Sequence, residues 1–188
     1  KYEGQSVNQI LWRTLPVSAA LGVTAYLIAL IFGITMGTLA ALKQNSWLDY
    51  ASMTVAMLGI SIPNFVLGPL LVLAFSLTLY WFPPALWNGF PSRSIVLPAL
   101  TLSAIYIAYI ARLTRSGMLE VLRSDYIRTA RAKGLTERQV VMRHALLGGL
   151  LPVVSFSGPA LAFLITGTVV VERVFALPGL GNYFINAC

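Results

Sequence analysis

The chain has 188 residues, of which 57% are apolar and 10% are charged, and its 13 basic and 6 acidic side chains give a net charge of +7. Four stretches contain no Asp, Glu, Lys or Arg, and they lie between Arg13 and Lys43, Asp49 and Arg93, Arg93 and Arg112, and Arg143 and Glu172. A soluble helix normally keeps one polar face, so this many uninterrupted apolar runs exclude a soluble fold. A secretory signal peptide is excluded too, because the first run is too long and three more follow it.

The apolar runs predict an all-α, polytopic membrane helical bundle, because a helix of about 20 residues crosses a hydrocarbon core about 30 Å thick. In chain order we expect four spans, at residues 15–42, 51–80, 95–111 and 147–171. The second run is long enough for two short spans broken near Pro63 and Pro69, but we favour one. It ends in Tyr80-Trp81-Phe82-Pro83-Pro84, where rings suited to the membrane interface meet prolines that stop a helix.

The distribution of the basic residues predicts the orientation of these spans. With four spans, Lys43 and the segment 112–143 share one face, and residues 1–13, Arg93 and Arg173 share the other. The first face holds nine Lys or Arg and the second holds four, so the positive-inside rule places Lys43 and the segment 112–143 in the cytoplasm. A basic segment facing anionic membrane lipids explains the net charge without a nucleic-acid partner.

Small and polar residues inside the spans predict how the helices pack and bend. Gly33 and Gly37 form a small-xxx-small pair, which allows two helices to approach closely. Four prolines interrupt backbone hydrogen bonding and bend their spans, either in a gate or in a static bundle: Pro63, Pro69, Pro152 and Pro159. Four uncharged polar residues at membrane depth either line a pathway for a peptide backbone or bond to neighbouring helices: Ser61, Asn64, Ser155 and Ser157.

The predicted cytoplasmic segment contains an amphipathic helical pattern near its centre. Four residues share one helical face by their spacing of three and four: Leu119, Leu122, Tyr126 and Ala130. We expect Ser124 or Asp125 to cap this helix with its side chain, Gly134 to end it in a left-handed turn, and a new helical stretch to begin near Thr136. Such a helix either lies in the lipid headgroups or docks in a groove of a cytoplasmic partner, and its small apolar residues favour the partner.

Several motifs are specific enough to indicate a family. The run Asp125-Tyr126-Ile127-Arg128-Thr129-Ala130-Arg131-Ala132-Lys133-Gly134-Leu135 is followed by Arg143-His144-Ala145-Leu146, Leu150-Leu151-Pro152, Val171-Glu172-Arg173-Val174-Phe175 and Leu177-Pro178-Gly179-Leu180-Gly181. Together these motifs resemble the inner-membrane permease subunits of ABC importers, in the dipeptide, oligopeptide and nickel branch. Residues 40–45 and the pair Asp49-Tyr50 are similar to the oligopeptide permease subunit in particular. The chain departs from the wider superfamily where Arg128-Thr129-Ala130 stands in place of the usual Glu-Ala-Ala.

The resemblance implies a permease subunit that forms the pathway for oligopeptides across the bacterial inner (plasma) membrane. Its implied partners are a second permease subunit, two cytoplasmic ATPase subunits that bind ATP and Mg, and an external substrate-binding protein. The resemblance also implies a coupling helix that docks in the ATPase, with the residues Asp125, Tyr126, Ile127, Arg128, Thr129, Ala130, Arg131, Ala132, Lys133 and Gly134. Members of this family usually have six spans, so we expect a single transmembrane domain, residues 1–188, that is a fragment without the first and last spans.

Other functions fit the sequence less well. An ion-coupled carrier typically has an ionisable group at membrane depth, and the four predicted spans contain neither Asp nor Glu. A membrane enzyme would need a nucleophile with a base or a metal pair, and His144 is the only histidine. We therefore expect no catalytic residue, no metal site and no cofactor in this chain. Within the permease interpretation, dipeptides, glutathione and nickel chelates stay open as alternative substrates.

Overall fold

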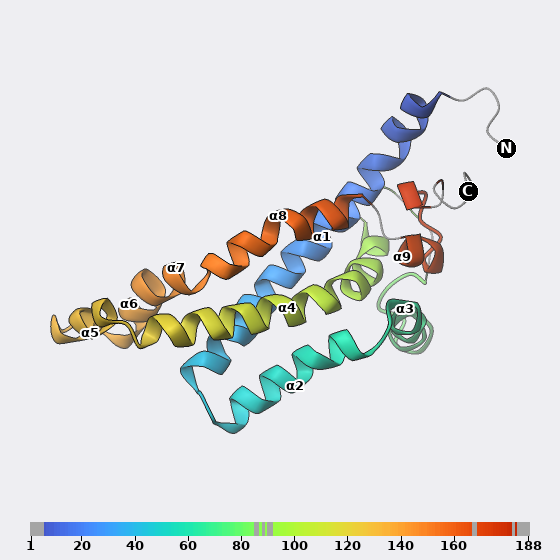
Figure 1. The fold of residues 1–188 in the computed structure, drawn as a ribbon. Helices are drawn as coiled ribbons and strands as arrows, with labels where there is room; N and C mark the ends of the chain where they lie inside the picture. The colour runs from blue at the N-terminus through green and yellow to red at the C-terminus, as the bar shows by residue number, and fades with distance from the viewer. Residues whose placement is uncertain are drawn as a thin grey trace. The chain divides into compact units, whose positions relative to one another are not determined.

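The computed structural model describes residues 6–84, 87, 89, 92–166, 169–181 and 183 of the chain. Its helices are, in chain order, α1 (Val7–Leu42), α2 (Trp47–Ser61), α3 (Asn64–Leu71), the π-helical η1 (Val72–Thr78), the 3-10 turn η2 (Arg93–Ile95), α4 (Val96–Leu122), α5 (Asp125–Ala132), α6 (Glu137–Val140), the π-helical η3 (Val141–Ala145), α7 (Leu146–Gly149), α8 (Leu151–Ile165) and α9 (Val169–Val174). The described residues contain no strand, so the predicted all-α fold class is confirmed (Figure 1).

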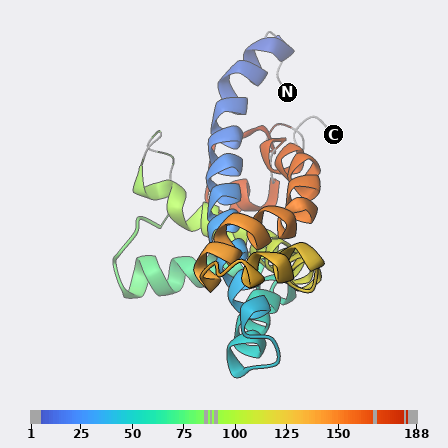
Figure 2. The same cartoon turned by 90° about the vertical axis from the view of Figure 1, so that its left-hand side faces the viewer.

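Helix α1 and the helical segment that ends with α4 are each long and apolar enough to cross a membrane. Helix α1 has 36 residues and the segment Arg93–Leu122 has 30, and at about 1.5 Å per residue both exceed a hydrocarbon core about 30 Å thick. Both views show α1 as one unbroken helix (Figure 1 and Figure 2). Helix α4 continues past residue 111, so the first part of the predicted cytoplasmic segment is helical.

The second and fourth predicted spans are each divided by a bend. The helix pair Trp47–Ser61 and Asn64–Thr78 is bent by 106°, and the pair Glu137–Gly149 and Leu151–Ile165 by 50°. The sharper bend falls at Pro63, which has the extended backbone angles φ −59° and ψ 142°. A residue before proline is disfavoured in the helical region, so α2 ends ahead of this position. Pro69 lies inside α3, so of the two predicted breaks only the one at Pro63 separates the helices.

The chain forms two compact units, which are described separately below. Unit 1 comprises Lys1–Ile28, Ser61–Ala104 and Pro159–Cys188, and unit 2 comprises Ala29–Ile60 and Ile105–Gly158. Every basic residue that we predicted on the cytoplasmic face belongs to unit 2, and every basic residue predicted on the other face belongs to unit 1. The orientation of the spans across the membrane stays a prediction.

In unit 2, the second half of α1 packs closely on α4 through two glycines. A Cβ atom at Gly33 would lie 2.7 Å from the side chain of Ile110, and one at Gly37 would lie 2.5 Å from the carbonyl oxygen of Ala111. Real Cβ atoms do not approach this closely, so any larger residue would push the helices apart. The close packing predicted from the small-xxx-small pair is confirmed. Buried alanines on α2 and α4, Ala56 among them, continue this tight packing.

In unit 1, the first part of α1 packs on the end of α8, and α9 packs on α3 (Figure 1). A Cβ atom at Gly22 would lie 2.5 Å from the carbonyl oxygen of Leu164, which places α1 and α8 almost in backbone contact. The fully buried ring of Phe175, just after α9, lies against Gly68 of α3. Helix α9 and the residue after it, which follow α8 in the chain, therefore form a central part of the packing in unit 1.

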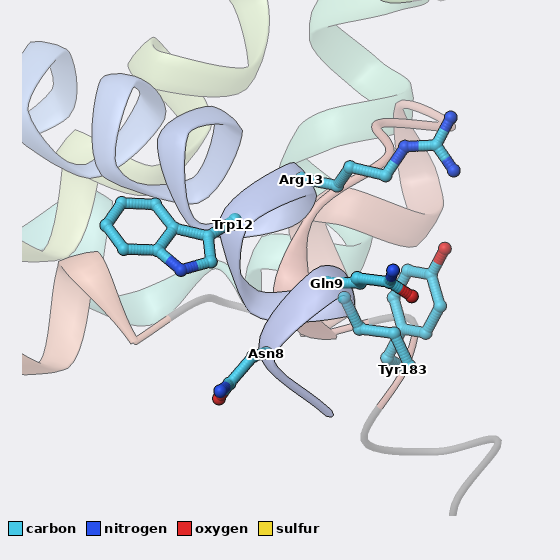
Figure 3. A pocket seen from close by; sticks show the side chains of 6 residues that line it. Asn8, Gln9, Trp12, Arg13 and Tyr183 are labelled. Carbon is cyan, nitrogen blue, oxygen red and sulfur yellow. The ribbon is translucent and has the colours of Figure 1, made fainter. Parts of the chain in front are cut away.

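A cavity of about 490 Å³ opens beside the first turns of α1 in unit 1 (Figure 3). Its lining comprises Asn8, Gln9, Ile10, Trp12, Arg13 and Tyr183. Trp12 is 80% exposed and points to the opposite side of the helix from Arg13. An exposed Trp next to a basic residue at the end of an apolar helix is typical of a membrane interface.

Candidate functional site

The predicted coupling residues form a short helix flanked by two turns. Helix α5 occupies Asp125–Ala132, with Ser124 and Lys133 as its flanking residues, and it lies within the run from Asp125 to Gly134 that the resemblance implies. Gly134 has φ +80°, so it takes the left-handed turn that its position predicted. The next helix begins after Thr136, whose side chain accepts a hydrogen bond from the Gln139 amide in a capping box.

Two details of the predicted helix are wrong. The Ser124 side chain donates to the carbonyl oxygen of Val121 at 2.6 Å and makes no cap for α5. The helix also does not continue from Leu119 and Leu122, because α4 ends at Leu122 and a turn separates it from α5. A local hydroxyl-to-carbonyl bond competes with capping, and the spacing pattern alone did not reveal the break.

The apolar face of α5 is buried within the chain itself. Ile127 is 0% exposed and Ala130 is 6% exposed, and both belong to a buried cluster with Met118 of α4 and Val140 of α6. We expected Ile127 and Ala130 to contact a partner, but here their side chains are covered by unit 2. The cluster anchors α5 to α4, α6 and the end of α1, where Ala41 completes it.

Three glycines and a tyrosine hold α7 against α4 and α5. A Cβ atom at Gly117 would lie 2.3 Å from the carbonyl oxygen of Gly149, so α4 and α7 meet backbone to backbone. A Cβ atom at Gly148 would lie 2.8 Å from the hydroxyl of Tyr126. Turned toward the viewer in Figure 2, helices α5, α6 and α7 gather at one end of unit 2. The candidate coupling segment is thus fixed to its neighbours by direct packing.

The basic residues of α5 differ in whether the chain itself neutralises them. Arg131 makes two hydrogen bonds to Glu137, of 2.7 and 3.2 Å. Arg128 approaches Asp125 at 3.5 Å, but both side chains are largely exposed, so this pair contributes little. Lys133 is exposed and is absent from the ion pairs that join described residues. Lys133 therefore offers the least neutralised charge on this helix.

An open cavity of about 410 Å³ lies on this part of unit 2. It is lined by Tyr126, Thr129, Ala130, Lys133, Leu135 and His144. The lining combines a phenol, a hydroxyl, an ammonium and an imidazole with two small apolar surfaces, so it suits a polar or acidic side chain from another protein. His144 precedes the fourth predicted span in the sequence, and the structure brings it to the wall of this cavity, together with α5.

A buried ion pair that sequence reasoning missed supports the same end of unit 2. The carboxylate of Asp49 is 3% exposed and accepts hydrogen bonds from Nε and Nη2 of Arg115, both at 2.7 Å. It also accepts the Asn45 amide at 3.0 Å, and Asn45 has the left-handed φ of +60°. Arg123 reaches the Gln44 side chain at 3.4 Å, so the turn between α1 and α2 lies beside the α4–α5 turn. No sequence pattern links Asp49 to Arg115, because the two residues are 66 positions apart in the chain.

The four residues predicted to line the pathway do not form one cluster within a single unit. Ser155 and Ser157 of α8 belong to unit 2, and each donates to a carbonyl oxygen one turn earlier, Leu151 and Val153. Ser61 and Asn64 belong to unit 1 and flank the bend at Pro63. The Oδ1 atom of Asn64 is buried and has no hydrogen-bond partner among the described residues. The pathway role of the four residues stays a prediction.

Comparison with known proteins defines the class. Residues 33–187 match the family described as the inner membrane component of binding-protein-dependent transport systems. The chain belongs to this family of inner-membrane components, as the sequence motifs indicated. The match includes α5 and parts of both units.

Particular relatives sharpen this placement. The chain is 50% identical over 186 residues to the oligopeptide transport system permease proteins OppB of Salmonella typhimurium and Escherichia coli K12, which covers 99% of this chain and 61% of each relative. It is 48% identical over 187 residues to the dipeptide transport system permease protein DppB of Bacillus subtilis, covering 60% of that relative. The chain thus spans about three fifths of the length of these relatives.

A solved structure supports the fold. An amino acid ABC transporter crystallised with histidines superposes with a TM-score of 0.66 at 14% identity, covering 96% of this chain and 79% of that one. At this identity the likeness concerns the fold alone.

Proposed function

We propose that this chain is the greater part of a permease subunit of an ATP-driven importer, in which α5 docks on a cytoplasmic ATPase. The observation that carries the proposal is the anchoring of α5: its apolar face is buried in unit 2, while its polar face and the cavity beside it are open. A push on such a helix is transmitted to α4 and α1 through side chains that already touch. The chain itself would supply no ATP chemistry, and ATP and Mg would be bound by the partner.

The burial pattern favours a protein partner over the lipid surface for α5. A helix that lies in the headgroup layer inserts its apolar face into the membrane. In α5 that face is occupied, since Ile127 is fully buried against its own chain. What α5 presents outward is Tyr126, Thr129 and Lys133, which are suited to hydrogen bonds and to an acidic group.

A matched pair of charge reversals tests the docking surface. Lys133→Glu places a negative charge in the cavity, whereas Arg143→Glu reverses an exposed charge outside its lining. We expect Lys133→Glu to reduce co-purification of the ATPase subunits at least tenfold and Arg143→Glu to leave it within twofold. Equal behaviour of the two variants would remove the cavity from the ATPase interface.

We propose peptides as the substrate class, with oligopeptides first and dipeptides, glutathione and nickel chelates as alternatives. The relatives' names support both peptide lengths at nearly the same identity, 50% and 48%. The Oδ1 atom of Asn64, which has no hydrogen-bond partner in the described part of the chain, is an acceptor suited to a peptide N–H. The assembled subunit would require a second permease, two ATPases and an external binding protein.

Uptake by reconstituted vesicles decides between this function and an ion-coupled carrier. The full-length subunit with its partners should take up labelled oligopeptide only when ATP is supplied, and unlabelled substrates of each class should compete in the order of their affinity. Uptake driven by a proton or sodium gradient without ATP would contradict the proposal. The buried Glu172 does not favour such a carrier, because its carboxylate oxygens are already hydrogen-bonded within the chain.

A further inference from the structure

Glu172 is a fully buried carboxylate that no transport step invoked above uses. It lies in α9 and is 0% exposed. The ion pairs among the described residues do not include it, so no basic side chain of that part of the chain neutralises it directly. A buried acidic group is costly unless hydrogen bonds replace the water that it has lost, so its partners should reveal its role.

Hydrogen bonds in a defined direction surround this carboxylate. The Leu180 amide donates to Oγ of Ser18 at 2.9 Å, and the same hydroxyl donates to Oε1 of Glu172 at 2.7 Å. The Gly181 amide donates to Oε2 at 2.7 Å. Each oxygen of the carboxylate therefore accepts a bond, and the hydroxyl of α1 relays one backbone amide to it. The arrangement needs an acceptor at both oxygens of the side chain.

The glycines of the motif Leu177-Pro178-Gly179-Leu180-Gly181 permit this arrangement. A Cβ atom at Gly179 would lie 2.3 Å from the carboxyl carbon of Glu172, and one at Gly181 would lie 2.9 Å from Oε2 and 2.6 Å from Cα of Val169. A side chain at either position would collide with the carboxylate or with α9. The two glycines are thus explained by the close approach of backbone to an acidic group, which the sequence pattern did not indicate.

The backbone of Glu172 holds the same segment at its other end. Its carbonyl oxygen accepts the Leu177 amide at 2.8 Å, and the Ala176 amide donates to the Arg173 carbonyl oxygen at 3.2 Å. Ala176 has φ +50°, the left-handed conformation that closes a helix and reverses the chain. The backbone carbonyl of Glu172 therefore binds the start of residues 177–181, and its carboxylate binds their end.

We propose that Glu172 is a positioning residue whose carboxylate fastens the segment 177–181 to α1 within unit 1. The motif after α9 and the hydroxyl of Ser18 then form one conformational unit with the acidic group at its centre. The assignment rests on the geometry of unit 1. Only its effect on uptake depends on the permease function proposed above.

Residue-resolved hydrogen exchange of the full-length subunit, in its assembled complex in lipid nanodiscs, tests the assignment. Ser18→Ala should accelerate exchange of the Leu180 amide about tenfold, because that amide loses its acceptor, while the Gly181 amide keeps Glu172 and changes less than threefold. Unchanged exchange at Leu180, or an equal increase at both amides and across unit 1, would overturn the assignment.

A charge-neutral variant with a neighbouring control extends the test. Glu172→Gln keeps the shape but replaces one of the two acceptor oxygens by a donor, and we expect at least one of the two amides to exchange about tenfold faster. Arg173→Gln alters the adjacent exposed residue and should leave both rates within twofold. Equal exchange in these two variants would overturn the role of the carboxylate. Absence of ATP-dependent uptake by the wild-type complex would instead contradict the permease function. Failure of the Glu172 assignment and failure of the permease function are therefore distinguishable.

Discussion

Helices α5 and α9 are both short, and each is fixed to the longer helices of its own unit by a different kind of contact. Helix α5 is held by an apolar side chain, Ile127, in a cluster of residues from α1, α4 and α6. Helix α9 packs on α3 and is held to α1 by an acidic side chain, Glu172, whose carboxylate bonds to a hydroxyl of α1 and to a backbone amide. Both side chains are 0% exposed.

The difference affects how each segment tolerates change. Apolar contact has no direction, so the position of α5 depends on volume and tolerates small losses. Hydrogen bonds to a buried carboxylate have direction and fixed partners, so the segment after α9 is held in one register and tolerates little substitution.

The largest effect is expected for Ile127→Ala, which removes the apolar side chain that holds α5 in its buried cluster. Removing a fully buried side chain of this size costs about 2–5 kcal/mol in the free energy of unfolding, and α5 should detach from α4. Thermal unfolding in detergent measures the loss, and uptake should fall while ATP hydrolysis continues. The matched variant Ile127→Val should lose no more than about 1.5 kcal/mol. Equal stability of the Ala and Val variants would show that α5 is not held by this side chain.

The contact between Gly179 and the Glu172 carboxylate should be disrupted by Gly179→Ala, which adds only a methyl group. The new methyl group would meet the Glu172 carboxylate at 2.3–2.5 Å, so the segment must shift, at about 1–3 kcal/mol. Gly158→Ala is the control, because a Cβ atom there meets nothing within 4 Å. The two melting temperatures give the comparison. If both variants melted with the wild type, the close approach at Gly179 would not be a constraint.

A substitution in the turn after α5 is expected to have a smaller effect on the free energy of unfolding. Gly134 has φ +80° and open space around a Cβ position, so Gly134→Leu strains only the backbone, by about 1–2 kcal/mol. We expect normal membrane insertion but uptake uncoupled from ATP hydrolysis, measured in the same vesicles. Gly134→Asn should restore coupling, since Asn tolerates the left-handed conformation. Wild-type uptake by the Leu variant would refute this role of the turn.

The smallest effect on stability is expected for Arg128→Ala. The pair with Asp125 is 3.5 Å long, and its side chains are 74% and 96% exposed, so its loss should change the free energy of unfolding by less than about 0.5 kcal/mol. If Arg128 contacts the ATPase, uptake will fall without a change in melting temperature. A large loss of stability would contradict the separation of α5 into a buried apolar face and an exposed polar one.

Much of this structure was predictable from local patterns. The apolar runs indicated the all-α class, the small residues Gly33 and Gly37 indicated the close packing of α1, and Gly134 and Thr136 indicated the C-terminal end of α5 and the start of α6. Each of these features depends on neighbours along the chain or on a single helical face. The family assignment rested on contiguous motifs and was equally accessible.

The sequence by itself determined that this protein is a helical membrane protein of the permease family, because hydrophobic length, charge distribution and contiguous motifs are encoded locally. Only the tertiary structure decided which side chains face inward. It covered Ile127, paired Asp49 with Arg115, and brought Glu172 to Ser18. These contacts join residues far apart in the chain, and each depends on packing that no local pattern specifies.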